Sequence, residues 1–222
     1  MNKLRNFVTL LHESTKRDYI GRMIDEKVSC MKKAKQYGHD YWDGDRRFGY
    51  GGYRYIPGWW TPVAEQLIAT YHLTNDSSIL DVGCGKGYLL YELKILLPGL
   101  TLLGMDISEY GISQSKEEIR DRLISHKAQD IYPFEDSQFD LVLSIGCLHN
   151  LKLGEIEQAL REIQRVGRDA YLLVESYKNN KEQFNLQCWA LTAETLIDTE
   201  SWLWLLKTCC YLGDYEFIYF RD

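Results

Sequence analysis

Three glycines at alternating positions, Gly83, Gly85 and Gly87, constrain this chain more than any other feature of its sequence. They follow an apolar segment that ends in the acid Asp81, and a helical pattern of apolar residues comes after them. Glycine adopts left-handed backbone conformations without strain, and its missing side chain lets a bulky, charged group approach the backbone. The pattern therefore predicts a buried strand, a tight turn and a helix in immediate succession.

The spacing of these glycines separates two kinds of nucleotide site. Dinucleotide-binding turns follow the pattern G-x-G-x-x-G, whose third glycine would fall here on Tyr88. Asp81 next to Gly83 would also repel a pyrophosphate, whereas it would attract an amino group. On its own, the turn is equally consistent with a structural turn in any α/β protein, and the segments that follow must decide.

Further strands follow along the chain, each ending in polar residues. Apolar segments end at Asp106 and at Asp130, and another leads into Cys147 and His149. Strands that alternate with helices form a parallel sheet, whose sites lie at the carboxyl ends of the strands. The expected strands cover residues 78–83, 100–106, 126–130, 139–145 and 170–176, and the expected helices cover residues 62–72, 86–97, 109–124 and 153–166.

In order and spacing, these segments resemble the motifs of class I S-adenosylmethionine-dependent methyltransferases over about residues 64–176. The resemblance implies a Rossmann-like α/β fold, with a mostly parallel sheet in a three-layer α/β/α arrangement. It implies S-adenosylmethionine as cofactor and S-adenosylhomocysteine as product. Asp81 would then meet the cofactor's amino group, Asp106 its ribose hydroxyls and Asp130 its adenine. The expected cofactor-binding residues are Asp81, Gly83, Cys84, Gly85, Gly87, Asp106, Ile107, Asp130, Ile131, Ser144 and Ile145.

The first sixty residues differ in character from the rest of the chain. Helices are expected over residues 2–12 and 17–37, followed by a long loop rich in glycine and aromatic residues. A loop of this length with so many aromatic side chains is typical of a functional segment rather than a disordered one. We therefore expect residues 1–60 to form a helical cap and substrate lid, and residues 61–222 to form the cofactor-binding domain.

Substrate contacts are expected from this lid and from the strand ends. Tyrosine and tryptophan rings attract cations and pack against sugars, and arginines hold phosphate or carboxylate groups through paired hydrogen bonds. The arginines could instead form surface ion pairs with Asp43 or Asp45. The expected substrate-binding residues are Arg46, Arg47, Tyr53, Trp59, Asn150 and Tyr177.

His149 is the leading candidate for a catalytic base, because imidazole accepts protons near neutral pH. The alternative is a structural histidine that shapes its loop. Residues 48–52, together with His149, are similar to a segment of the small-molecule phosphoethanolamine methyltransferases, which implies a gating tyrosine at Tyr50. Glu175, at the end of the fifth strand, completes the expected catalytic set. Because no clustered His, Cys, Asp and Glu ligands are present, no metal ion is expected.

The end of the chain departs from the family's usual pattern. The family normally closes its sheet with a helix and two strands, the last of them antiparallel. Here residues 199–210 predict a helix and residues 215–220 predict a single strand. Either the sheet lacks a strand, or residues 186–196 supply one out of order.

Charge and composition limit the function further. The chain of 222 residues carries a net charge of −6, with +4 in residues 1–47 and −10 in the rest, and this acidic domain disfavours a nucleic-acid enzyme. No apolar run is long enough to span a membrane, and the first residues lack the apolar core of a signal peptide. We therefore expect a cytoplasmic protein without nucleic-acid or membrane partners, whose six cysteines are free thiols.

The expected function is methyl transfer to a nitrogen or oxygen of a small polar metabolite, with an anionic metabolite as one option. A resemblance to bacterial small-molecule members of the family implies a phospho-compound or sugar of surface polysaccharide synthesis. Two alternatives stay open, namely a non-catalytic sensor or partner subunit on the same fold and an RNA or protein methyltransferase. The sequence predicts no oligomeric state.

Overall fold

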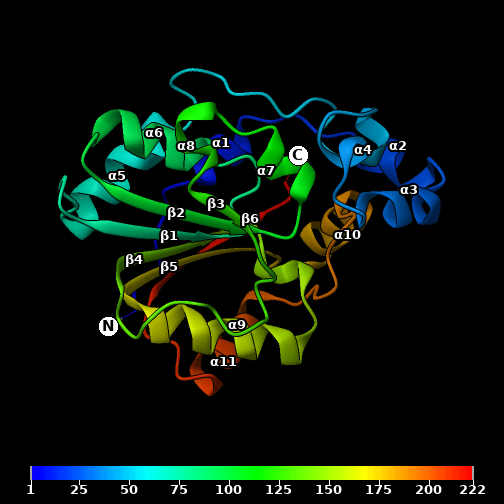
Figure 1. Cartoon of the computed structure of the whole chain (residues 1–222). Helices are drawn as coiled ribbons and strands as arrows, with labels where there is room; N and C mark the ends of the chain where they lie inside the picture. Colours follow the sequence, from blue (N-terminus) through cyan, green and yellow to red (C-terminus); the bar gives the residue numbers. More distant parts are fainter. Residues whose placement is uncertain (1, 222) are drawn as a thin grey trace.

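A sheet of six strands, all parallel, forms the centre of the computed structural model, which describes residues 2–221 (Figure 1). The strand order is β3-β2-β1-β4-β5-β6, so the direction of winding reverses between β1 and β4. Such a reversal opens a crevice at the carboxyl ends of the strands, where α/β proteins bind their ligands. The strands are β1 (Ser78–Val82), β2 (Thr101–Asp106), β3 (Leu123–Ser125), β4 (Phe139–Ile145), β5 (Gly167–Ser176) and β6 (Asp214–Tyr219).

Helices cover both faces of the sheet, which confirms the predicted Rossmann-like three-layer fold (Figure 1). One face carries α1 (Thr9–Glu13), α5 (Thr61–Tyr71), α6 (Tyr88–Leu96) and α8 (Glu117–Arg120), and the other carries α9 (Leu153–Val166) and α11 (Thr199–Thr208). Alternation along β1 supplies both cores. Leu80 packs in the cluster that contains Ile156 and Trp202, while Ile79 packs in the cluster that contains Leu67 and Leu90. Each such buried side chain contributes about 1.5–3 kcal/mol.

The cap lies beyond the carboxyl ends of the strands (Figure 1). It consists of α2 (Tyr19–Ile24), α3 (Lys27–Ala34), α4 (His39–Trp42), the short 3₁₀ helix η1 (Arg46–Phe48) and, against α2, the later helix α10 (Asn180–Trp189). The predicted single helix over residues 17–37 is wrong, because Glu26 adopts a left-handed conformation with φ of 42° and divides it. The predicted loop contains α4 and η1. The division of the chain at residue 60 stays a prediction.

The predicted helix over residues 2–12 is also wrong for most of its length. Leu4 instead forms a parallel bridge with Tyr215 on the free edge of β6, and α1 begins only at Thr9. The cause is the buried carboxylate of Glu216, which accepts hydrogen bonds from the backbone N–H groups of Phe7, Val8 and Thr9 at 2.6–3.0 Å. These bonds fix the backbone before the helix can begin.

The pairing of β6 with β5 decides between the two alternatives for the end of the sheet. β6 pairs directly with β5 in parallel register, and within residues 2–221 no strand lies between them. Residues 186–189 belong to α10 and residues 190–198 form no strand. The sheet therefore lacks the family's additional antiparallel strand, and the N-terminal segment lies along the edge instead.

The third strand is shifted from its predicted position. β3 covers Leu123–Ser125 rather than residues 126–130, because Leu123 and Ile124 offer apolar side chains to the core whereas residues 126–130 offer only Ala128. The predicted helix over residues 109–124 is correspondingly divided into α7 (Glu109–Ser113) and α8. Asp130 therefore lies in a loop five residues beyond the strand rather than at its end.

None of the helices in residues 2–221 is long and apolar enough to cross a membrane. All six cysteines are free thiols, and no group of three or more metal-binding side chains gathers anywhere in the described part of the chain.

Candidate active site

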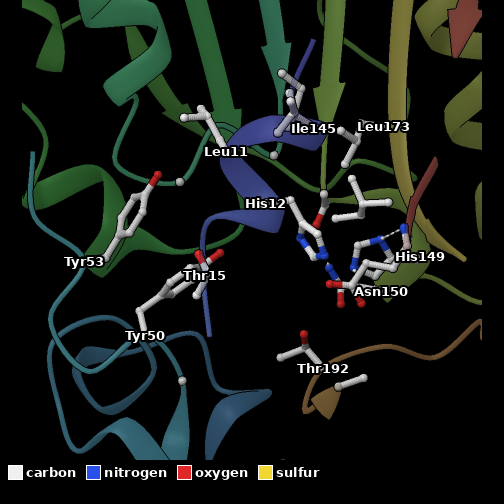
Figure 2. Close-up of a pocket in the computed structure, with 18 of the residues that line it drawn as sticks. Leu11, His12, Thr15, Tyr50, Tyr53, Ile145, His149, Asn150, Leu173 and Thr192 are labelled. Atoms are coloured by element: carbon white, nitrogen blue, oxygen red, sulfur yellow. Dashed lines mark hydrogen bonds and ion pairs between the residues drawn. The ribbon is translucent and has the colours of Figure 1, made fainter. Parts of the chain in front are cut away.

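A cavity of about 430 Å³ lies between the cap and the carboxyl ends of β1, β4 and β5. Figure 2 shows Tyr50 and Tyr53 on one side of it and His149, Asn150 and Thr192 on the other. Its walls come from widely separated parts of the chain. They include Arg17, Arg22, Arg46, Tyr50, Tyr53 and Trp59 from the N-terminal part, Asp81, Gly83, Cys84 and Gly85 from the glycine turn, and Ile145, His149, Asn150, Glu175 and Trp189 from the later segments.

The glycine turn forms the base of this cavity as the sequence predicts. Gly83, Gly85 and Gly87 all have left-handed backbones, with φ of 81°, 57° and 68°. The turn is held by the carboxylate of Asp106, which accepts the backbone N–H of Gly85 at 2.8 Å. A side chain at any of the three positions would strain the backbone.

Asp81 lines the cavity and has a buried oxygen without a partner. Its side chain is 5% exposed, and Oδ1 has no hydrogen-bond partner. Burial, together with the nearby carboxylate of Asp106, raises the pKa of Asp81 to about 7. A buried acceptor without a partner costs free energy unless a bound group supplies a donor. The position therefore favours a cationic donor such as an ammonium group.

Asp106 does not line the cavity. Besides Gly85 it accepts the backbone N–H of Ser108 at 2.7 Å, and burial raises its pKa. Trp42 of the cap covers this region, because its indole Nε1 donates to Ser108 Oγ at 2.8 Å. A β-carbon at Gly85 would lie 2.6 Å from the Trp42 ring. The ribose contact of Asp106 stays a prediction.

The other expected cofactor residues divide into two groups. Cys84 and Ile145 line the cavity with Asp81, Gly83 and Gly85. The remaining residues do not line it. Ser144 Oγ donates to Val82 O, and Gly87 is the N-cap of α6, beside Ile119. Ile107, Asp130 and Ile131 are exposed. Their contacts with a cofactor stay predictions.

His149 and Glu175 form a pair on the wall of the cavity. His149 Nε2 lies 3.5 Å from a carboxylate oxygen of Glu175, and His149 Nδ1 accepts the backbone N–H of Glu175 at 3.3 Å. Burial lowers the pKa of His149, against the opposing effect of the Glu175 carboxylate, so the imidazole is neutral near pH 7. A neutral imidazole has one lone pair, and here it is used at Nδ1. The Nε2–H therefore faces Glu175 and orients its carboxylate.

Stacked aromatic rings connect the cap to the glycine turn. The rings of Trp42 and Tyr50 are parallel within 4° at 5.2 Å, and Tyr53 lies 4.7 Å from Tyr50 and 5.1 Å from Tyr88. Such ring pairs contribute about 0.5–1.5 kcal/mol each beyond their buried area. Tyr50 and Tyr53 thus reach the cavity as expected, but as members of a packed stack.

Lys86, inside the glycine turn, fastens the cap to this stack. Its side chain is 4% exposed, and Nζ donates to both oxygens of Asp43 at 2.7 Å and contacts no other acidic side chain in residues 2–221. Nζ also donates to Tyr53 O, and the hydroxyl of Tyr110 donates to Asp43. The sequence analysis missed this ion pair, although a lysine between two glycines of a buried turn is the signal that could have indicated it.

We expect Lys86→Met to loosen the cap, because it leaves Asp43 without its cation and costs about 2 kcal/mol in lost charge-assisted hydrogen bonds. Amide hydrogen exchange should become faster in residues 37–55 and stay unchanged in the sheet. Lys33→Met is the matched control, because its ion pair with Asp40 is exposed and should contribute little. Equal exchange in both variants would contradict the fastening role.

Only some of the predicted substrate-binding residues lie at the cavity. Arg46, Tyr53, Trp59 and Asn150 line the cavity. Arg47 turns away and pairs with Asp25 at 2.6 Å and with Glu26 at 3.2 Å, so the alternative of a surface ion pair holds for it with different acids. Tyr177 packs outside the cavity, where its hydroxyl accepts from Gln183. Arg17 and Arg22 line the cavity without having been predicted, since nothing in their spacing separates them from ordinary surface arginines.

Comparisons with known proteins find similarity over the central part of the chain. Residues 80–173 match the family model described as a methyltransferase domain. Over 93 residues the chain is 33% identical to the malonyl-[acyl-carrier protein] O-methyltransferase of Legionella pneumophila. This alignment covers 40% of the present chain and 32% of that protein. Over 126 residues the chain is 28% identical to the mitochondrial arginine hydroxylase NDUFAF5 of Mus musculus, which covers 56% and 36%. The matches thus span about a third of these relatives.

A solved structure supports the fold. A chain of the complex that contains the Trm112 methyltransferase activator of Haloferax volcanii superposes with a TM-score of 0.55 at 19% identity, covering 88% of this chain and 77% of the other. The matching domain, the glycine turn and the parallel sheet together support a class I S-adenosylmethionine-dependent methyltransferase.

Proposed function

We propose that this chain binds S-adenosylmethionine at its glycine turn and transfers the methyl group to a nitrogen or oxygen of a small polar molecule in the cavity. The observation that carries the proposal is the buried, unpartnered Oδ1 of Asp81, beside three glycines with left-handed backbones. The family model supports the same chemistry.

The residues present fit this cofactor. Asp81 offers an acceptor to its ammonium group, Gly83 and Gly85 leave the backbone open to it, and Ile145 lies on the same wall. When bound, the cofactor supplies an electrophilic methyl group on a sulfonium. What remains for the chain is to hold the acceptor in line, to exclude water with the cap and to remove a proton from the acceptor.

Glu175 is the residue best placed to take that proton. It lines the cavity, and His149 orients it through Nε2–H. His149 can take a proton at Nδ1 only by losing the hydrogen bond from the backbone of Glu175. We therefore assign the base to Glu175 and a positioning role to His149, with Asn150 facing the acceptor through Oδ1, which is buried and has no partner in residues 2–221.

The size of the cavity supports a small acceptor. A cavity of about 430 Å³ has a volume typical of small-molecule sites. The acidic cofactor-binding domain supports the absence of nucleic-acid partners, and a cytoplasmic location stays a prediction.

The proposal is tested by calorimetry and by transfer of a labelled methyl group. S-adenosylhomocysteine should bind the purified chain, and label should pass into the small-molecule fraction of a cell extract. Label found only in the RNA or protein fraction would overturn the assignment of a small acceptor. Failure to bind S-adenosylhomocysteine would overturn the proposal itself.

We expect Glu175→Gln to lower kcat by at least about 100-fold, the range lost with a general base, while S-adenosylhomocysteine binds as before. His149→Gln should lower kcat less and shift the pH profile, because it changes only the orientation of the carboxylate. Initial rates across pH check both variants. A larger loss in His149→Gln than in Glu175→Gln would return the role of base to His149.

A further inference from the structure

Three arginines on the cap side of the cavity surround one tryptophan ring. The guanidinium carbons of Arg22, Arg46 and Arg17 lie 4.1, 5.0 and 5.6 Å from the centre of the Trp189 ring. All four residues line the cavity. Three positive charges from the N-terminal part of the chain are thus gathered around a ring that α10 supplies.

None of these three arginines pairs with a carboxylate in the described residues 2–221. Arg22 donates to the carbonyl oxygens of Arg46 and Gly49, and Arg46 also donates to Gly49 O. Arg17 donates to the carbonyl oxygens of His12 and Thr15. Most surface arginines of the same chain, by contrast, are matched with acids, as Arg47 and Arg161 are.

Their surroundings make the unbalanced charge costly. Burial lowers the pKa of Arg22 to about 10, with a further contribution from Arg46, and burial also lowers the pKa of Arg17 and of Arg46. His12 adds no compensating charge, because burial and Arg17 lower its pKa to about 4 and leave it neutral. Arg17 Nε is buried without a hydrogen-bond partner. Gathered cations with spare donors are stabilised by a bound anion.

The same cavity also holds the proposed base. Glu175 lines the same cavity and lies near enough to Arg17 to raise the pKa of that guanidinium against the effect of burial. A molecule held at the arginines by one end would therefore present its other end toward Glu175 and the glycine turn. The arrangement sets both the charge and the orientation of the acceptor.

We propose that Arg17, Arg22 and Arg46 form an oxyanion site against Trp189, and that the methyl acceptor carries a carboxylate or phosphate group held there. That the bound anion is the methyl acceptor rests on the proposed function. The anion site itself is inferred from the geometry of the arginines. Arg46 was expected to contact substrate, and the structure replaces its expected neighbour Arg47 with Arg17 and Arg22.

The test is a calorimetric titration of the full chain with inorganic phosphate and, separately, with succinate, at constant ionic strength. Binding of one and not the other tells phosphate from carboxylate. Arg22→Gln and Arg46→Gln should each weaken the binding at least about tenfold, as expected for loss of a charge-assisted contact. Arg47→Gln is the matched control and should bind as the wild type does, because Arg47 pairs with acids outside the cavity.

The outcomes separate this inference from the proposed function. If neither anion binds the wild type, or if the Gln variants bind as tightly as Arg47→Gln, the oxyanion site is wrong even where S-adenosylhomocysteine binds. If the anion binds as expected and S-adenosylhomocysteine does not, the site stands and the methyltransferase proposal fails. A labelled product that an anion-exchange resin does not retain would overturn the charge assigned to the acceptor.

Discussion

Replacing Glu216 by alanine is expected to lower the free energy of unfolding by about 3–5 kcal/mol, the usual cost of breaking a buried charged network. The Glu216 side chain is 1% exposed on the edge strand β6. Its carboxylate accepts from the hydroxyl of Tyr171 and from the Thr9 hydroxyl, in addition to three backbone N–H groups at the start of α1. Without the carboxylate these donors lose their acceptor in a buried place.

Urea denaturation and thermal melting measure this effect. For a chain of this size the loss corresponds to a fall in Tm of about 10 °C. Glu216→Gln should lie between wild type and Glu216→Ala, because it keeps the shape but offers one acceptor oxygen instead of two. Glu135→Ala is the control, since Glu135 is an exposed loop residue. A loss similar to that of the control would mean that Glu216 does not hold the N-terminal segment.

Glu216 also illustrates what the sequence could not predict. Its partners Phe7, Val8 and Thr9 lie more than two hundred positions away, and a local pattern carries no information about them. Residues 2–12 were expected to form a helix, and that expectation failed because a tertiary contact decided the backbone conformation. The same reason explains Arg17 and Arg22, whose common site exists only once α10 packs on the cap.

The features that the sequence predicted correctly depend on residues that are close to one another along the chain. The glycine turn combines conformational freedom with a buried strand and a following helix, and each of these features depends on residues within a few positions of one another. The sheet followed from the alternation of strands and helices. His149 and Glu175 were predicted because both follow strand ends, yet their tautomer and mutual orientation required coordinates. The ion pair of Lys86 and Asp43 could be predicted only in part. A lysine inside the glycine turn stands out in the sequence, whereas nothing in the sequence indicates that Asp43 is its partner.

The affinity for S-adenosylhomocysteine is expected to depend steeply on pH through Asp81. The pKa of Asp81 is raised to about 7 in the free chain, so about half of the molecules carry a protonated carboxyl at that pH. An ammonium group binds the ionised form. Binding therefore strengthens as the pH rises through 7 and levels off above about pH 8, whereas below 7 the Kd should rise about tenfold per pH unit.

Calorimetry from about pH 5.5 to about pH 8.5, in two buffers of different ionisation enthalpy, measures both the Kd and the proton released on binding. Asp81→Asn should bind more weakly at high pH, lose the pH dependence and release no proton. Glu175→Gln is the matched control, because it removes a different carboxylate from the same cavity and should keep the dependence. A Kd that stays constant in the wild type, or a dependence that survives in Asp81→Asn, would show that Asp81 does not meet the cofactor's ammonium group.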